Sequence, residues 1–321
     1  MPSRSRQKFM DLRQLRYFVG IVQAGSLSRA ADQLHVAQSA ISHHLAGLES
    51  ELNRQLVTRG PKGIVLTDAG EVLYRHAEAI LRHIDLAKRD AMSAQEVPSG
   101  RVSVGFPSAL SAMLGYELFA RVRREFPQIL LHVTDGNSSL LHERLSNSRL
   151  DIALLFAERP ERGIAIEPML TEELFYVTTG KNRSPITLAE TARRPLLVPG
   201  PGSGIQRALK QAFAERGLAL APVGEIDALG TLRRAVAAGI GDTVLPWSAL
   251  YEGKGKVALN YRHFADAKLK RTVALCFSEV GQRSPAIEVV AAALRSVIGD
   301  LIKNDTWQGV SVIGGPPGAS C

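Results

Sequence analysis

The stretch that decides the fold is LRQLRYFVGIVQAGSLSRAADQLHVAQSAISHHL, residues 12–45. Apolar residues recur at helical spacing in its first part. That pattern stops at Gly25 and Ser26, which can end one helix and cap the next. A second short helix closes near His35, and a third begins near Gln38. Two short helices joined by so tight a turn predict a helix-turn-helix.

The third helix presents polar side chains on its outer face, because Ile41 and Leu45 occupy its apolar side. The outward residues are Gln38, Ser39, Ser42 and His43. Their donors and acceptors suit base edges and phosphates, and a helix N-terminus attracts phosphate. A plain helical bundle with a solvated polar face is the alternative on this local pattern. Metal binding is disfavoured, because the adjacent His43 and His44 point in different directions on a helix.

A short hairpin is predicted directly after the third helix. Arg59 and Lys62 flank a Gly-Pro turn between two β-prone pieces, and Thr67 can cap the helix that follows. This arrangement predicts a wing beside the helix-turn-helix.

The helix after the wing carries apolar residues spaced 4, 3, 4, 3 and 4 apart. These residues are Leu73, Ala77, Ile80, Ile84, Ala87 and Ala91. Such a heptad seam predicts a long helix that pairs with a second copy of itself. The alternative is a helix packed on its own domain, since several seam residues are only alanine.

Composition and charge narrow the function classes. The 321 residues, 45% of them hydrophobic, are enough for two or three folding units. Residues 1–62 hold nine Lys or Arg against four Asp or Glu, which places +5 of the net +8 there and favours a polyanionic partner. Cys276 and Cys321 are too few for a disulfide framework. No stretch reaches the about 18 apolar residues of a membrane span, so we expect a cytoplasmic protein.

Residues 12–59, followed by GIVLTDAG at 63–70, resemble the DNA-binding region of LysR-type transcriptional regulators. The overall sequence has some similarity to the nitrogen assimilation control branch of that family. The resemblance implies DNA contacts by Gln38, Ser39, Ser42, His43 and Arg59, to which we add Lys62 of the wing. It departs at Ala37, where many members carry a capping serine, and at His43 and His44, which replace the commoner Arg or Gln. Members begin close to MDLRQLRYF, which makes Met10 an alternative start and residues 1–9 a disordered basic leader.

The chain changes character after SAQEVPSG, residues 93–100, which we interpret as a hinge. Strand-like runs such as RVSVGF, ILLHVTD, DIALLF and LFYVTTG (residues 174–180) then alternate with helical runs such as GIQRALKQAFAERG and TLRRAVAAG (residues 231–239). This alternation predicts parallel sheets covered by helices. The final residues, 304–321, have no periodic pattern, and we expect a mobile tail there.

Three polar loops follow strands in this part of the chain, where open parallel sheets bind ligands. They contain Ser108, Asn137 with Ser138, and Ser203, and their backbone amides at helix N-termini suit a small carboxylate. Ordinary turn and capping chemistry is the alternative for each loop. The family resemblance implies two lobes like those of periplasmic solute-binding proteins, with an effector between them. It assigns Ser108 and Ser138 to the first lobe and Gly202, Ser203 and Thr231 to the second.

An enzyme and an extracytoplasmic solute receptor are the competing function classes. The sequence has no phosphate-binding P-loop, no G-x-S-x-G elbow and no His-Glu-x-x-His motif, and a receptor leaves the winged helix without a role.

We therefore predict an α+β multi-domain regulator that is not an enzyme and needs no cofactor or metal. Its domains are a leader 1–9, a winged helix-turn-helix 10–68, a coiled-coil linker helix and hinge 69–98, an α/β two-lobed effector domain 99–303 and a tail 304–321. The expected macromolecular partners are double-stranded DNA with paired half-sites, RNA polymerase, and further copies of the chain in a homodimer or homotetramer. The expected small-molecule partner is an effector such as an organic acid. We expect no contact with a membrane.

Overall fold

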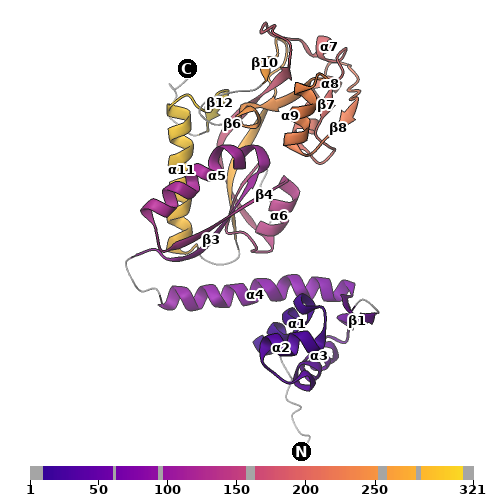
Figure 1. Cartoon of the computed structure of the whole chain (residues 1–321), viewed down its shortest axis with the longest axis vertical. Helices are drawn as coiled ribbons and strands as arrows, with labels where there is room; N and C mark the ends of the chain where they lie inside the picture. Colours follow the sequence, from indigo (N-terminus) through magenta and orange to yellow (C-terminus); the bar gives the residue numbers. More distant parts are fainter. Residues whose placement is uncertain are drawn as a thin grey trace, which may run out of the picture. The chain divides into compact units, whose positions relative to one another are not determined.

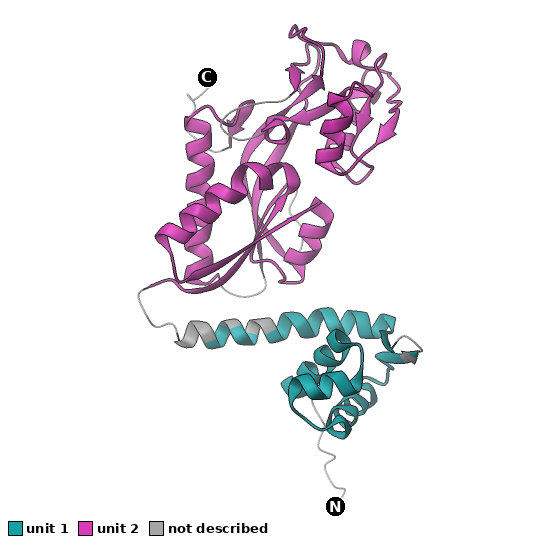
Figure 2. Cartoon of the chain, viewed as in Figure 1, with its two compact units in different colours: residues 1–94 teal, residues 95–321 magenta. Residues whose placement is uncertain are grey.

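The computed structural model describes residues 10–60, 63–92, 97–156, 163–251, 259–279 and 283–313. Figure 1 shows its elements, and Figure 2 its two compact units, residues 1–94 and 95–321. Within the described residues, every helix is too short or too polar to cross a bilayer. The expected leader at residues 1–9, the hinge residues 93–96 and the tail residues 314–321 lie outside the described residues.

The N-terminal unit is a winged helix-turn-helix, as predicted. Its elements are α1 (Leu12–Ala24), α2 (Leu27–Leu34), α3 (Gln38–Leu52), β1 (Val57–Gly60), β2 (Gly63–Leu66) and α4 (Asp68–Met92). The side chain of Asp11 caps α1, and the side chain of Ser26 caps α2. Gly25 ends α1 in the left-handed region at φ 64°, a conformation that costs glycine little. The local capping chemistry therefore sets where both helices begin and where α1 ends.

One core joins the helices of this unit. Phe18, Ile21, Ile41 and Leu48 are fully or almost fully buried in it. The wing leans on the α1–α2 turn, because Ile64 N donates to Gly25 O at 3.0 Å. A Cβ atom at position 63 would lie 2.6 Å from the same oxygen, and φ there is 108°, so the turn requires glycine.

The apolar residues of helix α4 have two kinds of surroundings: some pack in the core of the N-terminal unit, and others face solvent. Ala77 is fully buried in the core of the N-terminal unit, and Leu73 packs against that core. The first half of the predicted seam therefore serves intramolecular packing, which was the alternative interpretation of the heptad pattern. Ile80, by contrast, is 38% exposed, so the face beyond Ala77 is still open to a partner.

The first lobe of the C-terminal unit is built on three parallel strands. Strand β3 (Gly100–Pro107) lies between β4 (Ile129–Gly136) and β5 (Ile152–Leu155) and is parallel to both. Three helices complete the lobe: α5 (Ser108–Glu125), α6 (Ser138–Ser146) and α11 (Pro285–Lys303). Helix α11 packs against α5 (Figure 1), and Arg121 of α5 donates to Asp300 of α11 at 2.7 Å.

Two long strands connect the lobes and change the character of the sheet. Strands β6 (Ile164–Thr178) and β11 (Lys270–Ser278) pair antiparallel, and β11 also pairs antiparallel with β5. Strands β9 (Thr243–Pro246), β10 (Asn260–Arg262) and β12 (Val310–Val312) all pair antiparallel with β6. The sheet is therefore mixed. Among the strands that the structure describes in this unit, the pairs β3–β4, β3–β5 and β7–β8 are parallel, as expected, and the others are antiparallel. The antiparallel pairs arise because β6 and β11 run through both lobes in opposite directions.

The second lobe has its own core, with Leu209, Phe213, Val236 and Leu245 buried at its centre. Its elements are α7 (Leu188–Thr191), β7 (Leu197–Val198), α8 (Gly204–Ala214), β8 (Gly224–Glu225), α9 (Leu229–Ala237) and α10 (Trp247–Leu250).

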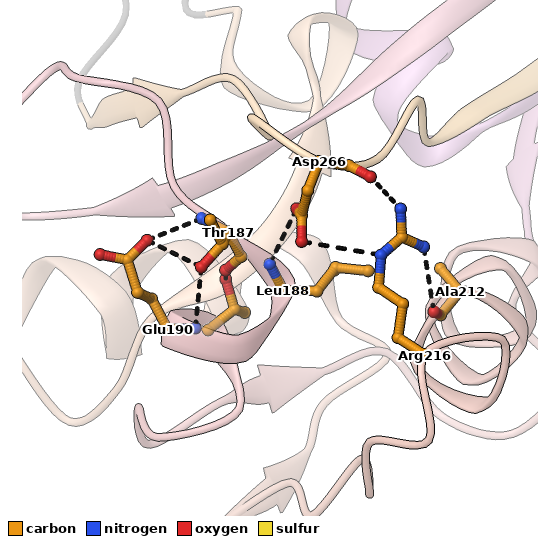
Figure 3. Close-up of polar contacts among 7 residues, drawn as sticks. Thr187, Leu188, Glu190, Ala212, Arg216 and Asp266 are labelled. Carbon is orange, nitrogen blue, oxygen red and sulfur yellow. Dashed lines mark hydrogen bonds and ion pairs between the residues drawn. The ribbon is translucent and has the colours of Figure 1, made fainter.

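Asp266 ties distant segments of this lobe together (Figure 3). Its carboxylate accepts from Leu188 N at 3.0 Å and pairs with Arg216 Nε at 3.6 Å. Arg216 also donates to the backbone carbonyl of Asp266. These contacts hold α7, the end of α8 and the segment before β11 as one body.

The C-terminal segment corrects the expectation of a mobile tail from residue 304. Trp307 is 1% exposed in the core of the first lobe, called the first core below, and Trp247 Nε1 donates to Thr306 O at 2.7 Å. Glu173 N donates to Gly309 O at 2.7 Å, and β12 then pairs with β6. One buried tryptophan and one short strand carry no periodic signal, which explains why the sequence pattern missed them.

Candidate functional site

Helix α3 presents the predicted polar surface opposite a buried apolar face. Ile41 and Leu48 are fully buried, whereas Gln38, Ser39 and His43 are exposed and Ser42 is partly exposed. The N-cap residue Ala37 makes no side-chain hydrogen bond. The first-turn amides of α3 therefore lack a side-chain acceptor, which leaves a partial positive charge there for an external phosphate.

The two adjacent histidines of α3 have different surroundings. The ring of His44 lies 5.0 Å from the ring of Tyr17 on α1, in an edge-to-face arrangement. His43 stays exposed, with its ring 6.1 Å from that of His44. Among the residues that the structure describes, no three His, Cys, Asp or Glu side chains gather as a metal site would need. His44 thus supports the packing of α3, and His43 belongs to its outer surface.

The predicted wing is present, but the structure does not describe its two predicted basic side chains. Strands β1 and β2 pair antiparallel, with Arg59 opposite Ile64. The side chain of Arg59 is not described, and Lys62 lies outside the described residues. Glu49 of α3 accepts from Leu56 N at 2.8 Å, which fixes the start of the hairpin to the end of α3.

The second candidate site is a cavity of about 490 Å³ in the C-terminal unit. The first lobe contributes Ser108, Asn137 and Ser138 to its wall, and the second lobe contributes Gly202 and Ser203. The structure thus brings together five of the six residues predicted for the effector. The sixth, Thr231, is exposed on α9 and is not part of the cavity lining that the structure describes. Helix α9 begins earlier than the sequence pattern suggested, so Ala228 and Leu229 line the cavity instead.

Four helices begin at this cavity: α5, α6, α8 and α9. Two of them are capped by side chains, since Asn137 accepts from Leu140 N at 2.8 Å and Ser203 accepts from Ile205 N at 3.2 Å. The N-cap residues of α5 and α9 are Pro107 and Ala228, which make no side-chain cap. The first-turn amides of α5 and α9 can therefore bind an anion in the cavity.

Sequence reasoning missed two aspartates in the cavity wall. Ser108 Oγ donates to Asp135 Oδ1 at 2.7 Å, and Gly200 N donates to Asp227 Oδ1 at 2.8 Å. Both aspartates are exposed, and none of the described cationic side chains lies at ion-pair distance from either. Their position within polar loops predicts turns, but it does not predict that the two loops line the same cavity.

A buried ion pair also borders the cavity, where β6 and β11 pair between the lobes. Arg271 lines the cavity and donates through Nε to Glu172 Oε1 at 2.8 Å, with a second bond from Nη2. Glu172 is fully buried and also accepts from Ser248 Oγ at 3.0 Å. The guanidinium lies 3.5 Å from the ring centroid of Phe156. Burial lowers the pKa of Arg271, and the contact with Glu172 opposes that shift.

Comparisons with known proteins cover nearly the whole chain. Residues 12–71 match the model of the bacterial regulatory helix-turn-helix protein, lysR family, and residues 95–299 match that of the LysR substrate binding domain. The nitrogen assimilation regulatory protein nac of Escherichia coli (strain K12) is 35% identical over 308 residues, which cover 94% of this chain and 100% of that protein. The protein of the same name from Klebsiella aerogenes is 33% identical over 294 residues, 90% of this chain and 95% of that one.

Solved structures agree with this result. A full-length OxyR variant from Pseudomonas aeruginosa has a TM-score of 0.70 at 25% identity, covering 89% of this chain and 98% of that one. Full-length CbnR, solved as a complex with its target DNA, has a TM-score of 0.66 at 21% identity, covering 90% of this chain and all of that one. The likeness to CbnR shows the fold alone.

Proposed function

The chain belongs to the LysR family of bacterial helix-turn-helix regulators, and from this premise we propose how its two sites work. It is a DNA-binding transcriptional regulator with an effector-binding substrate domain. Family membership, rather than the lack of a catalytic motif, is what assigns the chain to regulators and not to enzymes.

DNA is proposed to be read by the outer face of α3. Gln38 and Ser42 would contact base edges in the major groove, while Ser39, His43 and the uncapped start of α3 would contact phosphates. Arg59 and Lys62 of the wing would add backbone contacts. The observation that carries this proposal is the exposed polar face of α3 set against a buried apolar face, within a continuous family match over residues 12–71.

The effector is proposed to bind in the cavity between the lobes. Ser108 and Ser138 would contact it from the first lobe, with Asn137 beside them, and Gly202 and Ser203 from the second. The convergence of four helix N-termini supports a ligand that carries a carboxylate, such as an organic acid. Thr231, exposed on α9, would act at most indirectly.

Assembly into a homodimer or homotetramer would place two winged domains on paired half-sites. The exposed Ile80 on α4 is the residue through which we expect two copies to meet. The site of action would be the bacterial cytoplasm, where the promoter DNA and RNA polymerase are found. The names of the two nac relatives favour target genes of nitrogen assimilation.

The test of DNA reading is a gel shift with Gln38→Ala on a site first located by genomic footprinting. Loss of a base contact costs about 1–3 kcal/mol, so affinity for the cognate site should fall while affinity for random DNA is retained. Gln23→Ala is the matched control, because Gln23 is an exposed glutamine on α1 outside the proposed surface. Equal loss on both DNAs would assign Gln38 to a phosphate, and no loss on either would remove it from the surface.

A further inference from the structure

The charges around the cavity indicate which class of molecule fits it. This inference rests on the proposed function, in which the cavity holds the effector. Partial positive charge comes from the backbone, at the starts of α5, α6, α8 and α9. Full negative charge comes from the side chains of Asp135 and Asp227. The wall thus carries both signs at separate places.

The positive part of the wall is a set of amides rather than a free cation. Pro107 and Ala228 leave the first turns of α5 and α9 without a side-chain acceptor. Arg271 reaches the cavity with a side chain that is 9% exposed, but Glu172 holds it at 2.8 Å and balances its charge. An anionic group would therefore bind at the helix starts, with the neutral Arg271–Glu172 pair beside it.

The two aspartates of the cavity wall can accept further hydrogen bonds. Asp135 accepts from Ser108 and Asp227 accepts from Gly200, which gives each carboxylate one hydrogen bond from the residues that the structure describes. A carboxylate offers about four acceptor sites, so each has room for a ligand donor. None of the described cations is at ion-pair distance from either aspartate. A ligand that is only an anion would face two uncompensated carboxylates, and a ligand that is only a cation would face four helix starts.

We propose that the cavity receives a small zwitterion of the α-amino acid class. Its carboxylate binds the first-turn amides of α5 and α9, and its ammonium donates to Asp135, Asp227 or both. A cavity of about 490 Å³ leaves room for an amino acid side chain, which would contact apolar wall residues such as Phe156 and Leu245. Because α5 belongs to the first lobe and α9 to the second, such a ligand makes polar contacts with both lobes at once.

Isothermal titration calorimetry on the full chain tests the ligand class. The twenty natural α-amino acids are titrated singly, and each that binds is compared with its 2-hydroxy acid, which lacks the ammonium, and with its amide, which lacks the carboxylate. A hydrogen bond to a charged group is worth about tenfold to hundredfold in affinity. We expect at least one amino acid to bind, and both of its analogues to bind at least about tenfold more weakly.

Variants assign the ammonium contact. Asp135→Asn and Asp227→Asn remove the charge yet keep an Oδ1 acceptor for Ser108 and Gly200, so the loops should hold their conformation. At least one of them should reduce the preference for the amino acid over its 2-hydroxy acid by about tenfold. Glu117→Gln is the matched control, since Glu117 is exposed on α5 and does not line the cavity.

Three results would overturn the proposal while leaving the proposed function in place. One is that 2-hydroxy acids or other organic acids bind as tightly as the amino acids, which would make the ligand a simple anion. The second is that no amino acid binds. The third is that both aspartate variants keep the full preference of the wild type. Failure of the premise that the cavity holds the effector would appear elsewhere, in Ser138→Leu, which fills part of the cavity. A variant that binds the ligands of the wild type unchanged would place the effector outside the cavity.

Discussion

The buried pair of Glu172 and Arg271 allows a sharp test of how the two lobes are held. Glu172 is fully buried, and Arg271 is 8% exposed. In Arg271→Met the carboxylate of Glu172 would keep only the hydroxyl of Ser248 as a partner. Removing one member of a buried ion pair costs about 3–5 kcal/mol, because the other charge stays buried without compensation.

The double variant Glu172→Gln with Arg271→Met should regain most of this loss. It leaves no charge buried at these two positions, and the amide of a glutamine can still bond to Ser248. For a domain of this size, about 1 kcal/mol shifts the melting temperature by about 2–4 °C, so the single variant should melt about 6–20 °C lower. Arg193→Met, at an exposed arginine of the second lobe, is the control and should melt like the wild type.

Tryptophan fluorescence is the appropriate assay. The chain has only two tryptophans, Trp247 and Trp307, and both are buried in the first core of the C-terminal unit. Their emission therefore follows unfolding of that unit and not of the winged domain. A single variant within about 1 kcal/mol of the wild type, or a double variant as unstable as the single one, would refute the charge argument.

Three further outcomes are expected. Ile80→Glu, which places like charges at the exposed face of α4, should weaken self-association in sedimentation velocity, and an unchanged oligomer would show that copies meet elsewhere. Ser138→Leu should fill part of the cavity and abolish thermal stabilisation by ligands that stabilise the wild type; a retained shift would remove Ser138 from the site. Burial raises the pKa of Glu167, but hydrogen bonds and charge from two arginines outweigh it and hold that pKa below 4.5. The contribution of Glu167 is thus present above pH 4.5 and lost as the pH falls below it, so urea titrations of Glu167→Gln should differ from the wild type at neutral pH and converge in acid.

Local sequence signals were sufficient for the winged domain. The caps at Asp11 and Ser26, the glycine at position 25 and the apolar periodicity each depend on residues within one or two helical turns. They set where α1 and α2 begin and where α1 ends, and the outward face of α3 follows from the 3.6-residue period. The heptad pattern of α4 was ambiguous for the same reason: periodicity identifies an apolar face but does not say what covers it. The core of the same unit covers Leu73 and Ala77.

Strand β6 shows what a local pattern cannot determine. A strand was expected only from residue 174, yet β6 begins at Ile164. The missing part carries Glu167, Glu172 and Glu173, which break the apolar alternation. Each finds a cationic or imidazole partner far along the chain: arginines 283 and 295 for Glu167, Arg271 for Glu172 and His263 for Glu173. The strand therefore depends on charges that only the folded chain brings together.

The sequence by itself determined the winged helix-turn-helix and the surface proposed to meet DNA, because both rest on caps, turns and periodicities formed between near neighbours. The class of regulator followed from the resemblance of residues 12–59 and 63–70 to the LysR family, and the loops proposed to meet the effector followed from their polar composition together with that resemblance. Only the tertiary structure decided that those loops share one cavity, that Asp135, Asp227 and Arg271 border it, and that Thr231 does not. The physical reason is strand register. Pairing of β6 with β11 sets Glu172 opposite Arg271 across almost a hundred residues of chain, and no local preference of either segment specifies that match.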